Sequence, residues 1–255
     1  MDPTPGQDLR DCFNLDRVAV VLCGGKSQRM GQDKGLMPFG HTSMLQRVVA
    51  ALASSVAQVA IVGQANQHAS RAELFQQSPP ATTTGQDARS SVPAGAKRGS
   101  ATSEHSGANL CIPVQIVDDM VADSGPLEGL RSGLISFSER PPEAIVFVCG
   151  CDYPLLTPRL VTWMFESLLA DDWAGAAWVD GKYWPLPAVY RMRALPVVEQ
   201  LLAAEQRSLQ ALLQSIPVTR FSEAALRAID PDLLGLRSVD TPEALAQLRH
   251  AAKLD

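Results

Sequence analysis

The sequence predicts an α/β protein: a three-layer α/β/α sandwich around a mixed, mostly parallel sheet that includes one β-hairpin. Short apolar runs that end at glycine alternate with stretches whose apolar residues recur at helical spacing, which is the order of βαβ units. An Asp-Gly pair lies between two further strand-like runs, and this pair favours the tight turn that joins antiparallel strands. One hairpin within the alternating pattern makes the predicted sheet mixed.

The first half of the chain is typical of a βαβ unit. Residues 17–22 form a continuous apolar run that ends at glycines, the pattern of a buried parallel strand. A helix is expected over residues 44–56, where apolar residues recur at helical spacing and Thr42 or Ser43 is placed to cap them. Residues 59–62 form the second short strand.

Residues 76–108 differ from the rest of the chain in composition. Ser, Thr, Pro, Gly, Ala and Gln dominate there, and no aromatic residue occurs between Phe75 and Phe137. Such a stretch buries too little apolar surface to offset the entropy lost on ordering. We therefore expect a disordered insertion within one domain over residues 17–255, after a flexible N-terminus at residues 1–16. A substrate lid or docking arm is the functional alternative for the insertion.

The second half continues the alternation of strands and helices. The apolar run at 144–149 is the most convincing central strand, and Pro126 suits the first turn of the helix before it. The final helix begins with Thr241 as a cap, then a proline and an acidic residue. The strands expected here lie at 114–117, 144–149, 174–179, 182–190, 217–221 and 236–239, and the helices at 125–137, 158–169, 195–204, 208–213 and from 241.

Composition and charge exclude several classes of function. The formal net charge of -5 argues against a general nucleic-acid binder, which needs a basic surface. No apolar run approaches the ~20 residues that cross a bilayer. The N-terminal residues lack the basic start and apolar stretch of a secretory signal, and five irregularly spaced cysteines do not suggest a disulfide framework. We expect a cytoplasmic protein that binds neither nucleic acid nor membranes.

A glycine-rich segment after the first strand carries the strongest chemical signal. Glycines let backbone N–H groups approach an anion closely, and Lys26, Arg29 and Lys34 supply positive charge. The segment is not a P-loop, because Val20 stands where that motif requires its first glycine, and it lacks the dinucleotide-binding fingerprint. We predict a phosphate-binding loop, with a plain glycine-rich turn as the alternative. The segment is Leu22-Cys23-Gly24-Gly25-Lys26-Ser27-Gln28-Arg29-Met30-Gly31-Gln32-Asp33-Lys34.

This segment resembles the molybdenum cofactor guanylyltransferase family, one of the nucleotidyltransferases with a Rossmann-like, glycosyltransferase-A-type fold. The resemblance implies transfer of GMP from GTP to molybdopterin or Mo-molybdopterin, with release of pyrophosphate and with Mg²⁺ as cofactor. Other molybdenum cofactor biosynthesis proteins or acceptor proteins are the further partners that it implies. The matching segments that follow in family order are Gly125-Pro126-Leu127-x-Gly129, Cys151-Asp152-Tyr153-Pro154, residues 187–190 before Arg207-Ser208-Leu209, and Asp240-Thr241-Pro242-Glu243.

Two acidic residues are candidate metal ligands. Nucleotidyl transfer concentrates negative charge at the α-phosphate, and Mg²⁺ held by one or two carboxylates neutralises it. Asp152 is the better candidate because it directly follows a buried strand, where a charge is costly unless it holds a cation or hydrogen-bond donors. Its alternative role is to cap the turn before Pro154. Asp240 is the weaker candidate, which either assists the metal or caps the last helix.

The resemblance also implies the remaining site residues. Arg29 and Lys34 would hold the triphosphate and stabilise the charge that develops on it, with Asp152 as the third catalytic group. Asp119 would lie against the nucleotide, although a solvated acid at a strand end is the alternative. The nucleotide contacts implied in this way are Leu22, Cys23, Gly24, Gly25, Lys34, Gln64, Asp119 and Asp152.

The choice of nucleotide rests on a few residues of the phosphate loop. Leu22-Cys23-Gly24-Gly25 is closer to the Leu-Ala-Gly-Gly of relatives that use GTP than to the Thr-Ala-Ala-Gly of relatives that use CTP. Cys23 stands where the family usually carries Ala, and Asp240 where it usually carries Asn. A cytidylyltransferase for the same cofactor and a sugar-1-phosphate nucleotidyltransferase are the enzymatic alternatives. A nucleotide-binding module without catalysis is the third alternative, and the three intact catalytic candidates argue against it.

Overall fold

The computed structural model describes residues 16–24, 33–64, 68–76, 112–119 and 125–254. Several expectations from the sequence concern other residues. The N-terminus expected to be flexible, apart from Asp16, and the expected insertion, apart from Gln76, lie outside the described residues, as do Gly25 and Arg29 of the phosphate loop.

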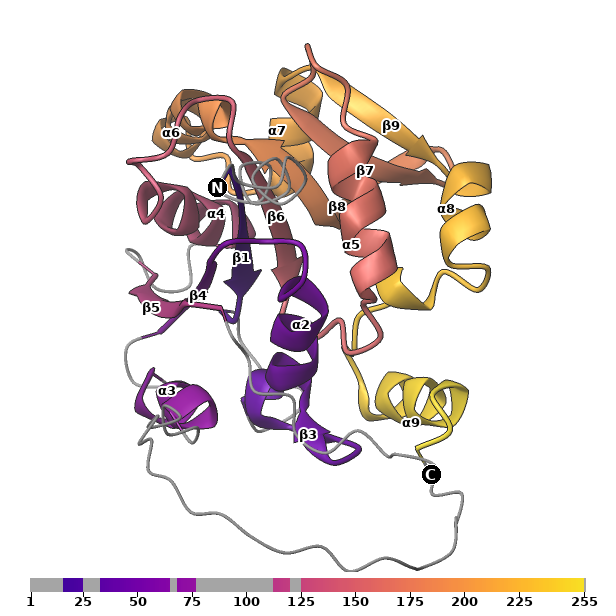
Figure 1. Ribbon diagram of the computed structural model, residues 1–255. Helices are drawn as coiled ribbons and strands as arrows, with labels where there is room; N and C mark the ends of the chain where they lie inside the picture. Colours follow the sequence, from indigo (N-terminus) through magenta and orange to yellow (C-terminus); the bar gives the residue numbers. More distant parts are fainter. Residues whose placement is uncertain (1–15, 25–32, 65–67, 77–111, 120–124, 255) are drawn as a thin grey trace, which may run out of the picture.

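A seven-stranded sheet runs through the described chain in the order β5-β4-β1-β6-β8-β7-β9 (Figure 1). Its first four strands are parallel. β1 (Arg17–Leu22) lies between β4 (Val59–Gly63) and β6 (Ile145–Gly150), and β5 (Val114–Asp118) forms the outer edge beyond β4. The carboxyl ends of these strands therefore meet at one edge of the sheet, where open α/β sheets bind ligands.

The other half of the sheet contains the predicted hairpin. β7 (Ala174–Val179) and β8 (Lys182–Arg191) are antiparallel, and β8 also pairs antiparallel with β6. The two turn residues, Asp180 (φ 50°) and Gly181 (φ 74°), are both left-handed, as a type I′ turn requires. β9 (Val218–Ser222) pairs parallel with β7. The sheet is thus mixed and mostly parallel, which confirms the predicted fold class.

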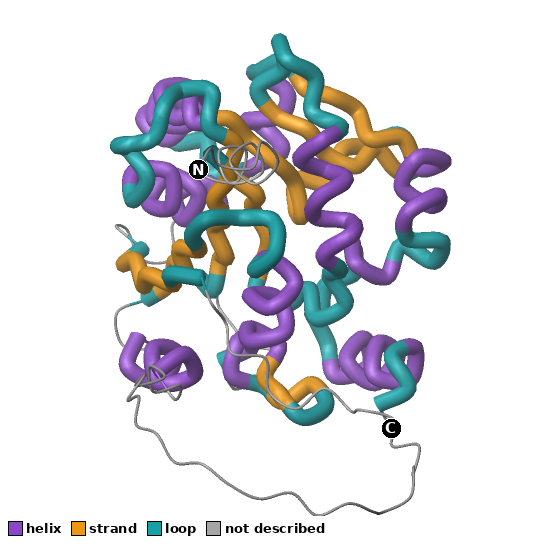
Figure 2. Tube along the Cα trace, in the orientation of Figure 1, coloured by secondary structure: helices purple, strands orange, loops and turns teal. Residues whose placement is uncertain are grey.

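Helices cover both faces of the sheet and complete the three layers, as the tube in Figure 2 also shows. On one face lie α2 (Met44–Leu52), α5 (Pro158–Glu166) and α8 (Glu223–Ile229). On the other face lie α4 (Pro126–Ile135), α6 (Leu195–Ala203) and α7 (Leu209–Ser215). Within the described ranges, no helix has both the length and the apolar character needed to cross a membrane.

Strand β1, which lies inside the sheet, contributes to a hydrophobic core on each face. Val18 and Val20 pack into the core on the α4 side, whereas Ala19 and Val21 pack into the core on the α2 side. Because successive side chains of a strand point to opposite faces, burial on both faces requires a continuous apolar run. Helix α4 approaches β1 closely at Gly133, where an added Cβ would lie 2.5 Å from Cγ1 of Val20.

A third, smaller core joins the last helix to the segment that follows the phosphate loop. Phe39 packs with Leu245 of α9 (Pro242–Ala251) in this core. Phe39 belongs to β2 (Pro38–Phe39), which forms a two-stranded ribbon with β3 (Thr42–Ser43). The guanidinium of Arg249 adds a 2.6 Å hydrogen bond to the carbonyl of Pro38. This packing holds the C-terminal segment beside the carboxyl end of the sheet.

The prediction of a strand at residues 236–239 is wrong. Leu234–Leu236 form a 3₁₀ turn, and Val239 donates its N–H to the carbonyl of Asp152 (2.8 Å) without joining an edge of the sheet. Leu236 and Val239 are buried in two different cores. Their apolar character therefore reflects burial on two sides of a crossing segment, which produces the same local pattern as a strand.

Some helix boundaries and elements also differ from the expectations. Helix α2 ends at Leu52, because Ala53 and Ser55 form a turn that leads the chain back to β4. The ribbon β2–β3, helix α8 and helix α3 (His68–Gln76) were not predicted. α3 is polar along most of its length and carries no apolar stripe, so its periodicity gives no helical signal.

We predict that Gly133→Ala lowers the free energy of unfolding by about 1–3 kcal/mol, the usual cost of overpacking a core. This loss should appear in urea denaturation even though alanine favours a helix more than glycine does. The control is the Val20→Ala background, which removes the methyl groups that the new Cβ would meet. The same substitution should cost much less there. Equal losses in the two backgrounds would show that the approach of α4 to β1 does not restrict this position.

Candidate functional site

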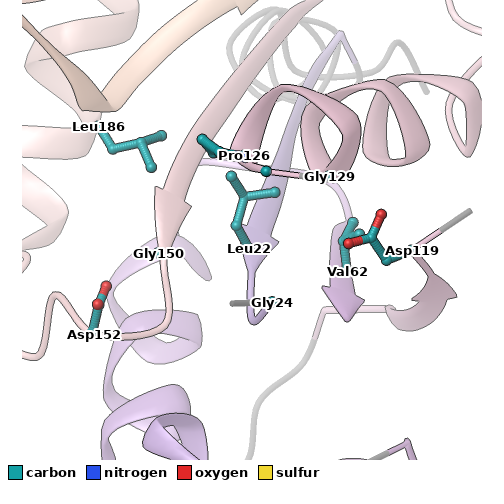
Figure 3. A pocket seen from close by; sticks show the side chains of 10 residues that line it. Leu22, Gly24, Val62, Asp119, Pro126, Gly129, Gly150, Asp152 and Leu186 are labelled. Atoms are coloured by element: carbon teal, nitrogen blue, oxygen red, sulfur yellow. The ribbon is translucent and has the colours of Figure 1, made fainter. Parts of the chain in front are cut away.

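A cavity of about 320 Å³ opens at the carboxyl ends of β1, β4 and β6. Figure 3 shows Asp152 and Asp119 on opposite sides of this cavity, with Leu22 and Gly24 between them. These four residues were all expected to contact a nucleotide. The tertiary structure therefore brings together residues from three separate segments of the sequence. The start of α4 and Leu186 of β8 complete the wall.

The end of β1 supplies the floor of the cavity. Leu22 accepts a hydrogen bond from the N–H of Cys151 (3.1 Å), and Cys23 donates its N–H to the carbonyl of Val62 (2.7 Å). These sheet hydrogen bonds therefore hold the start of the glycine-rich segment as far as Cys23, directly before Gly24. Cys23 itself is buried in the core on the α2 side and does not line the cavity, so the structure does not bring its thiol to the expected nucleotide contact.

Asp119 lies on the cavity wall opposite Asp152. Its N–H continues the sheet by donating to the carbonyl of Gly63 (2.9 Å), and one of its carboxylate oxygens is buried. Its other oxygen faces Gly24, where a Cβ would lie 3.5 Å away. Asp119 is therefore not the fully solvated acid that was the alternative. Gln64, the other expected contact in this region, is half-buried and does not line the cavity.

The ammonium group of Lys34 joins the two candidate metal ligands. Its Nζ donates to Oδ2 of Asp152 (3.2 Å) and to Oδ1 of Asp240 (2.9 Å). The side chains of Lys34 and Asp152 are 18% and 19% exposed, whereas that of Asp240 is 61% exposed. The second oxygen of Asp240 accepts a 2.7 Å hydrogen bond from Ser238. Three of the expected site residues thus form one cluster, which carries a net charge of about -1 when all three are ionised.

Burial and charge act in opposite directions on this cluster. Burial raises the pKa of Asp152 above its ordinary value, although the charge of Lys34 partly opposes the shift. Burial alone would lower the pKa of Lys34, but the hydrogen bonds and charges of Asp240 and Asp152 outweigh it, and the pKa is raised. Lys34 therefore stays cationic at neutral pH. The environment of Asp152 disfavours its charged form, which an additional cation would stabilise.

Local backbone features hold each member of the cluster. Lys34 begins a 3₁₀ turn whose N-cap, Asp33, accepts a hydrogen bond from the N–H of Gly35 (2.9 Å). Asp152 follows the end of β6, and a side chain at Gly150 would collide with its carboxylate. The backbone hydrogen bond between Val239 and Asp152 places the next residue, Asp240, close to Asp152 and Lys34. Glycine at position 150 is therefore a steric requirement of the site.

The structure settles one of the alternatives left open for Asp240. The N-cap of α9 is Thr241, whose hydroxyl oxygen accepts from the N–H of Ala244 (3.2 Å). The carboxylate of Asp240 is directed to Lys34 and Ser238 instead. Asp240 therefore does not cap the helix, and it lies where it could act together with Asp152.

Asp152 and Asp240 fit the requirements of a Mg²⁺ ion that also binds substrate phosphates. They already share one cation, the ammonium of Lys34. In such sites Mg²⁺ takes one or two carboxylates and completes its octahedral shell with phosphate oxygens and water. Among the residues that the structure describes, no group of three or more His, Cys, Asp or Glu could hold a metal ion by itself. A cation here would therefore depend on oxygens from the bound nucleotide.

One buried residue beside the site was not found from the sequence. Arg71 of α3 is fully buried and contacts both Cys23 and Asp33. It occurs in a polar segment next to the expected insertion, where an arginine is normally a solvated surface residue. No pattern of spacing or composition could have distinguished it.

Curated relatives with similar sequences share one name. The protein named "Probable molybdenum cofactor guanylyltransferase" from Methanothermobacter thermautotrophicus (strain Delta H) is 32% identical over 234 residues, which cover 91% of this chain and 98% of that protein. The protein of the same name from Methanosarcina mazei is 28% identical over 240 residues, which cover 93% of this chain and 92% of that protein.

Solved structures show the same fold at lower identity. Molybdopterin-guanine dinucleotide biosynthesis protein A from Archaeoglobus fulgidus superposes with a TM-score of 0.66 at 17% identity, covering 93% of this chain and 98% of that chain. The 4-diphosphocytidyl-2C-methyl-D-erythritol synthase from Anaerococcus prevotii gives a TM-score of 0.63 at 10% identity, covering 94% and 97%. At these identities the likeness shows the fold alone.

The family follows from a match that spans most of the chain. Residues 19–220 match the family described as the MobA-like NTP transferase domain. The matched region contains the central strand, Lys34, Asp119 and Asp152. This chain belongs to the MobA-like NTP transferase domain family.

Proposed function

We propose that this protein transfers GMP from GTP to molybdopterin or Mo-molybdopterin, forming the guanine dinucleotide cofactor and releasing pyrophosphate. The observation that carries the proposal is the cluster of Lys34, Asp152 and Asp240, in which Asp152 lines the cavity. Membership of the NTP transferase family supports the reaction type. The name shared by the similar curated proteins supports guanine as the base and the molybdenum cofactor as the acceptor.

The charged cluster suits a triphosphate that arrives with a divalent cation. Lys34 remains cationic because two carboxylates raise its pKa, so it can donate to phosphate oxygens and stabilise the charge that develops during transfer. Asp152 and Asp240 would hold Mg²⁺, which when bound neutralises charge on the phosphates and orients the leaving pyrophosphate. A nucleotide would thereby replace the ammonium–carboxylate contacts with ammonium–phosphate contacts.

The opposite wall of the cavity suits a guanine base. A carboxylate is an acceptor with two oxygens, and guanine presents two adjacent donors, N1–H and the N2 amino group. Asp119 lies across the cavity from Asp152, with its carboxylate toward Gly24. Leu22, Pro126 and Gly129 supply an apolar surface between the two acids for the flat base. Cytosine lacks the paired donors, so Asp119 is the residue that would favour GTP over CTP.

The acceptor needs no activation by a protein nucleophile. A phosphate monoester has a second pKa of about 6, so the terminal phosphate of molybdopterin is a dianion near neutral pH. The protein's contribution is to orient the two phosphates and to stabilise charge, which is the main source of catalysis in such transfers. The proposed reaction implies a cytoplasmic enzyme that exchanges its substrate and product with other molybdenum cofactor biosynthesis proteins or acceptor proteins.

Titrating the purified protein with GTP, CTP, ATP and UTP in the presence of Mg²⁺ by calorimetry tests the choice of nucleotide. We expect a clear preference for GTP, and pyrophosphate release when Mo-molybdopterin is added. Removing Mg²⁺ with a chelator should abolish turnover, because the carboxylate cluster alone repels the triphosphate. A preference for CTP would point to cytidylyl transfer, and one for UTP or ATP to activation of a sugar phosphate. Binding without turnover would leave a nucleotide-binding module.

Substitution of Asp119 should change the nucleotide preference. We expect Asp119→Ala to weaken GTP binding by about 1–3 kcal/mol, the usual cost of losing a bidentate contact to a base, and to leave CTP binding almost unchanged. The two affinities, measured by calorimetry on the same preparation, give the result as a ratio. If both nucleotides weaken equally, Asp119 does not read the base.

Substitution of Asp152 should separate activity from stability. Asp152→Asn should lower kcat by about 10²-fold or more, the range seen when an aligned electrostatic contact to the transition state is lost. Burial raises the pKa of Asp152 in the folded protein, so above that pKa its charge reduces stability. The free energy of unfolding, measured without nucleotide or Mg²⁺, should therefore stay unchanged or rise. A large loss of stability together with activity would argue for a structural role.

A further inference from the structure

Helix α3 places one arginine inside the protein next to the candidate site. The relative exposure of Arg71 is 0%, although arginine is almost never fully buried unless it is paired. Removing a guanidinium from water carries a large desolvation cost that only good hydrogen-bond partners offset. The partners of Arg71 therefore indicate what the buried charge is for.

Arg71 links two residues near the opposite ends of the glycine-rich segment. Its Nη2 donates to the carbonyl of Cys23 (2.8 Å), the residue between Leu22 and Gly24 of the cavity. Its Nε donates to Oδ2 of Asp33 (3.1 Å), and its Nη2 lies 2.9 Å from the same oxygen. One planar guanidinium thus binds the end of β1 and the N-cap of the turn that carries Lys34.

The link continues through Asp33 to Lys34. While Oδ2 of Asp33 contacts Arg71, its Oδ1 accepts from the N–H of Gly35 and caps the turn that begins at Lys34. The ammonium of Lys34 then reaches Asp152 (3.2 Å). A shift of Arg71 would therefore move the N-cap of this turn, and with it the cation that contacts Asp152 of the cavity.

The end of β4 leaves space for the guanidinium of Arg71. A Cβ added at Gly63 would overlap Nη1 of Arg71 and come within 3.3 Å of the carbonyl of Cys23. The last residue of β4 must therefore be glycine for the arginine to reach its partners. The end of β1, the N-cap of the Lys34 turn and the end of β4 thus converge on this one side chain.

We propose that Arg71 is a positioning residue for nucleotidyl transfer, which fixes the end of β1 and the Lys34 turn relative to each other. This inference rests on the proposed function. Arginine suits the role because its planar fork can serve two acceptors at once and stays charged when buried. A lysine at this position keeps the charge but has no second donor in fixed geometry.

A second buried arginine provides a matched control. Arg191 is 9% exposed and donates to the carbonyls of Asp172 (2.9 Å) and Glu143 (2.9 Å). It pairs with Ile145, at the opposite end of β6 from Gly150. Five strand residues at ~3.3 Å each separate the two ends by roughly 16 Å. Its removal tests what the loss of a buried arginine does to this fold away from the cavity.

The experiment compares Arg71→Met, Arg71→Lys and Arg191→Met with the wild-type protein. Thermal unfolding gives Tm, and pyrophosphate release with GTP, Mg²⁺ and Mo-molybdopterin, measured well below each Tm, gives kcat/KM. Arg71→Met should lower kcat/KM by about 10- to 100-fold, as losses of supporting hydrogen bonds around a site do. Arg71→Lys should recover part of that loss. Arg191→Met should lower Tm and leave kcat/KM unchanged.

Two further variants keep the test decisive if Arg71→Met does not fold. Gly63→Ala retains the arginine but displaces its guanidinium, and Asp33→Asn removes the charge that it binds. Each should lower kcat/KM in the same direction as Arg71→Met. The double variant Gly63→Ala/Asp33→Asn should be little worse than the more damaged single variant, because both act through one link. Additive losses would contradict a single link.

Different results would overturn this inference and the proposed function. Wild-type kcat/KM in the folded Arg71 variants, or equal losses at Arg71 and Arg191, would show that Arg71 only stabilises the fold. Wild-type protein that turns over CTP instead of GTP would overturn the proposed function, and the same comparison with CTP would still test Arg71. Wild-type protein that turns over no nucleotide would overturn both.

Discussion

The ammonium group of Lys34 joins three parts of the chain that are distant in sequence. It contacts Asp152 at the end of β6 and Asp240 before α9. Two of the three side chains are largely withdrawn from water, so the contacts act in a medium where charges interact strongly and where an unpaired charge is costly. Burial raises the pKa of Asp152 even with Lys34 beside it, so the carboxylate is only partly compensated. A site of this kind suits the ligand proposed above, which would bring both a cation and phosphate oxygens.

The fold supplies this arrangement through packing rather than through local sequence. The small core around Phe39 and Leu245 fixes α9 against the segment that follows Lys34. The hydrogen bond from Val239 to Asp152 fixes the position of Asp240 relative to the carboxyl end of β6. Gly150 leaves space for the carboxylate of Asp152. These contacts hold the site residues in a defined geometry, as the scaffold of a preorganised site must.

The specificity of the site lies in a few side chains and not in the sheet. The same fold occurs in a molybdopterin-guanine dinucleotide biosynthesis protein and in a diphosphocytidyl-methylerythritol synthase, at TM-scores of 0.66 and 0.63. A shared fold therefore does not choose the base or the acceptor. In this chain the cavity has an acid on each side and an apolar surface between them. Their chemistry is the basis of the proposal that the site binds a purine with paired donors.

Local sequence patterns determined the central strand, the hairpin, the cap at Thr241 and the three-layer architecture, because strand and helix periodicity and turn chemistry depend on neighbouring residues. They also predicted a site role for Asp152, since a charge next to a buried strand end is costly without a ligand, and for Lys34, since the glycine-rich segment ends in basic residues that suit an anion. Only the tertiary structure decided that Asp240 reaches Lys34, that the thiol of Cys23 faces the core, and that Arg71 is buried. It also showed that residues 236–239 cross the sheet end instead of forming a strand. An apolar or charged residue shows by its type that it needs burial or a partner, but the partner itself is set by how distant segments pack.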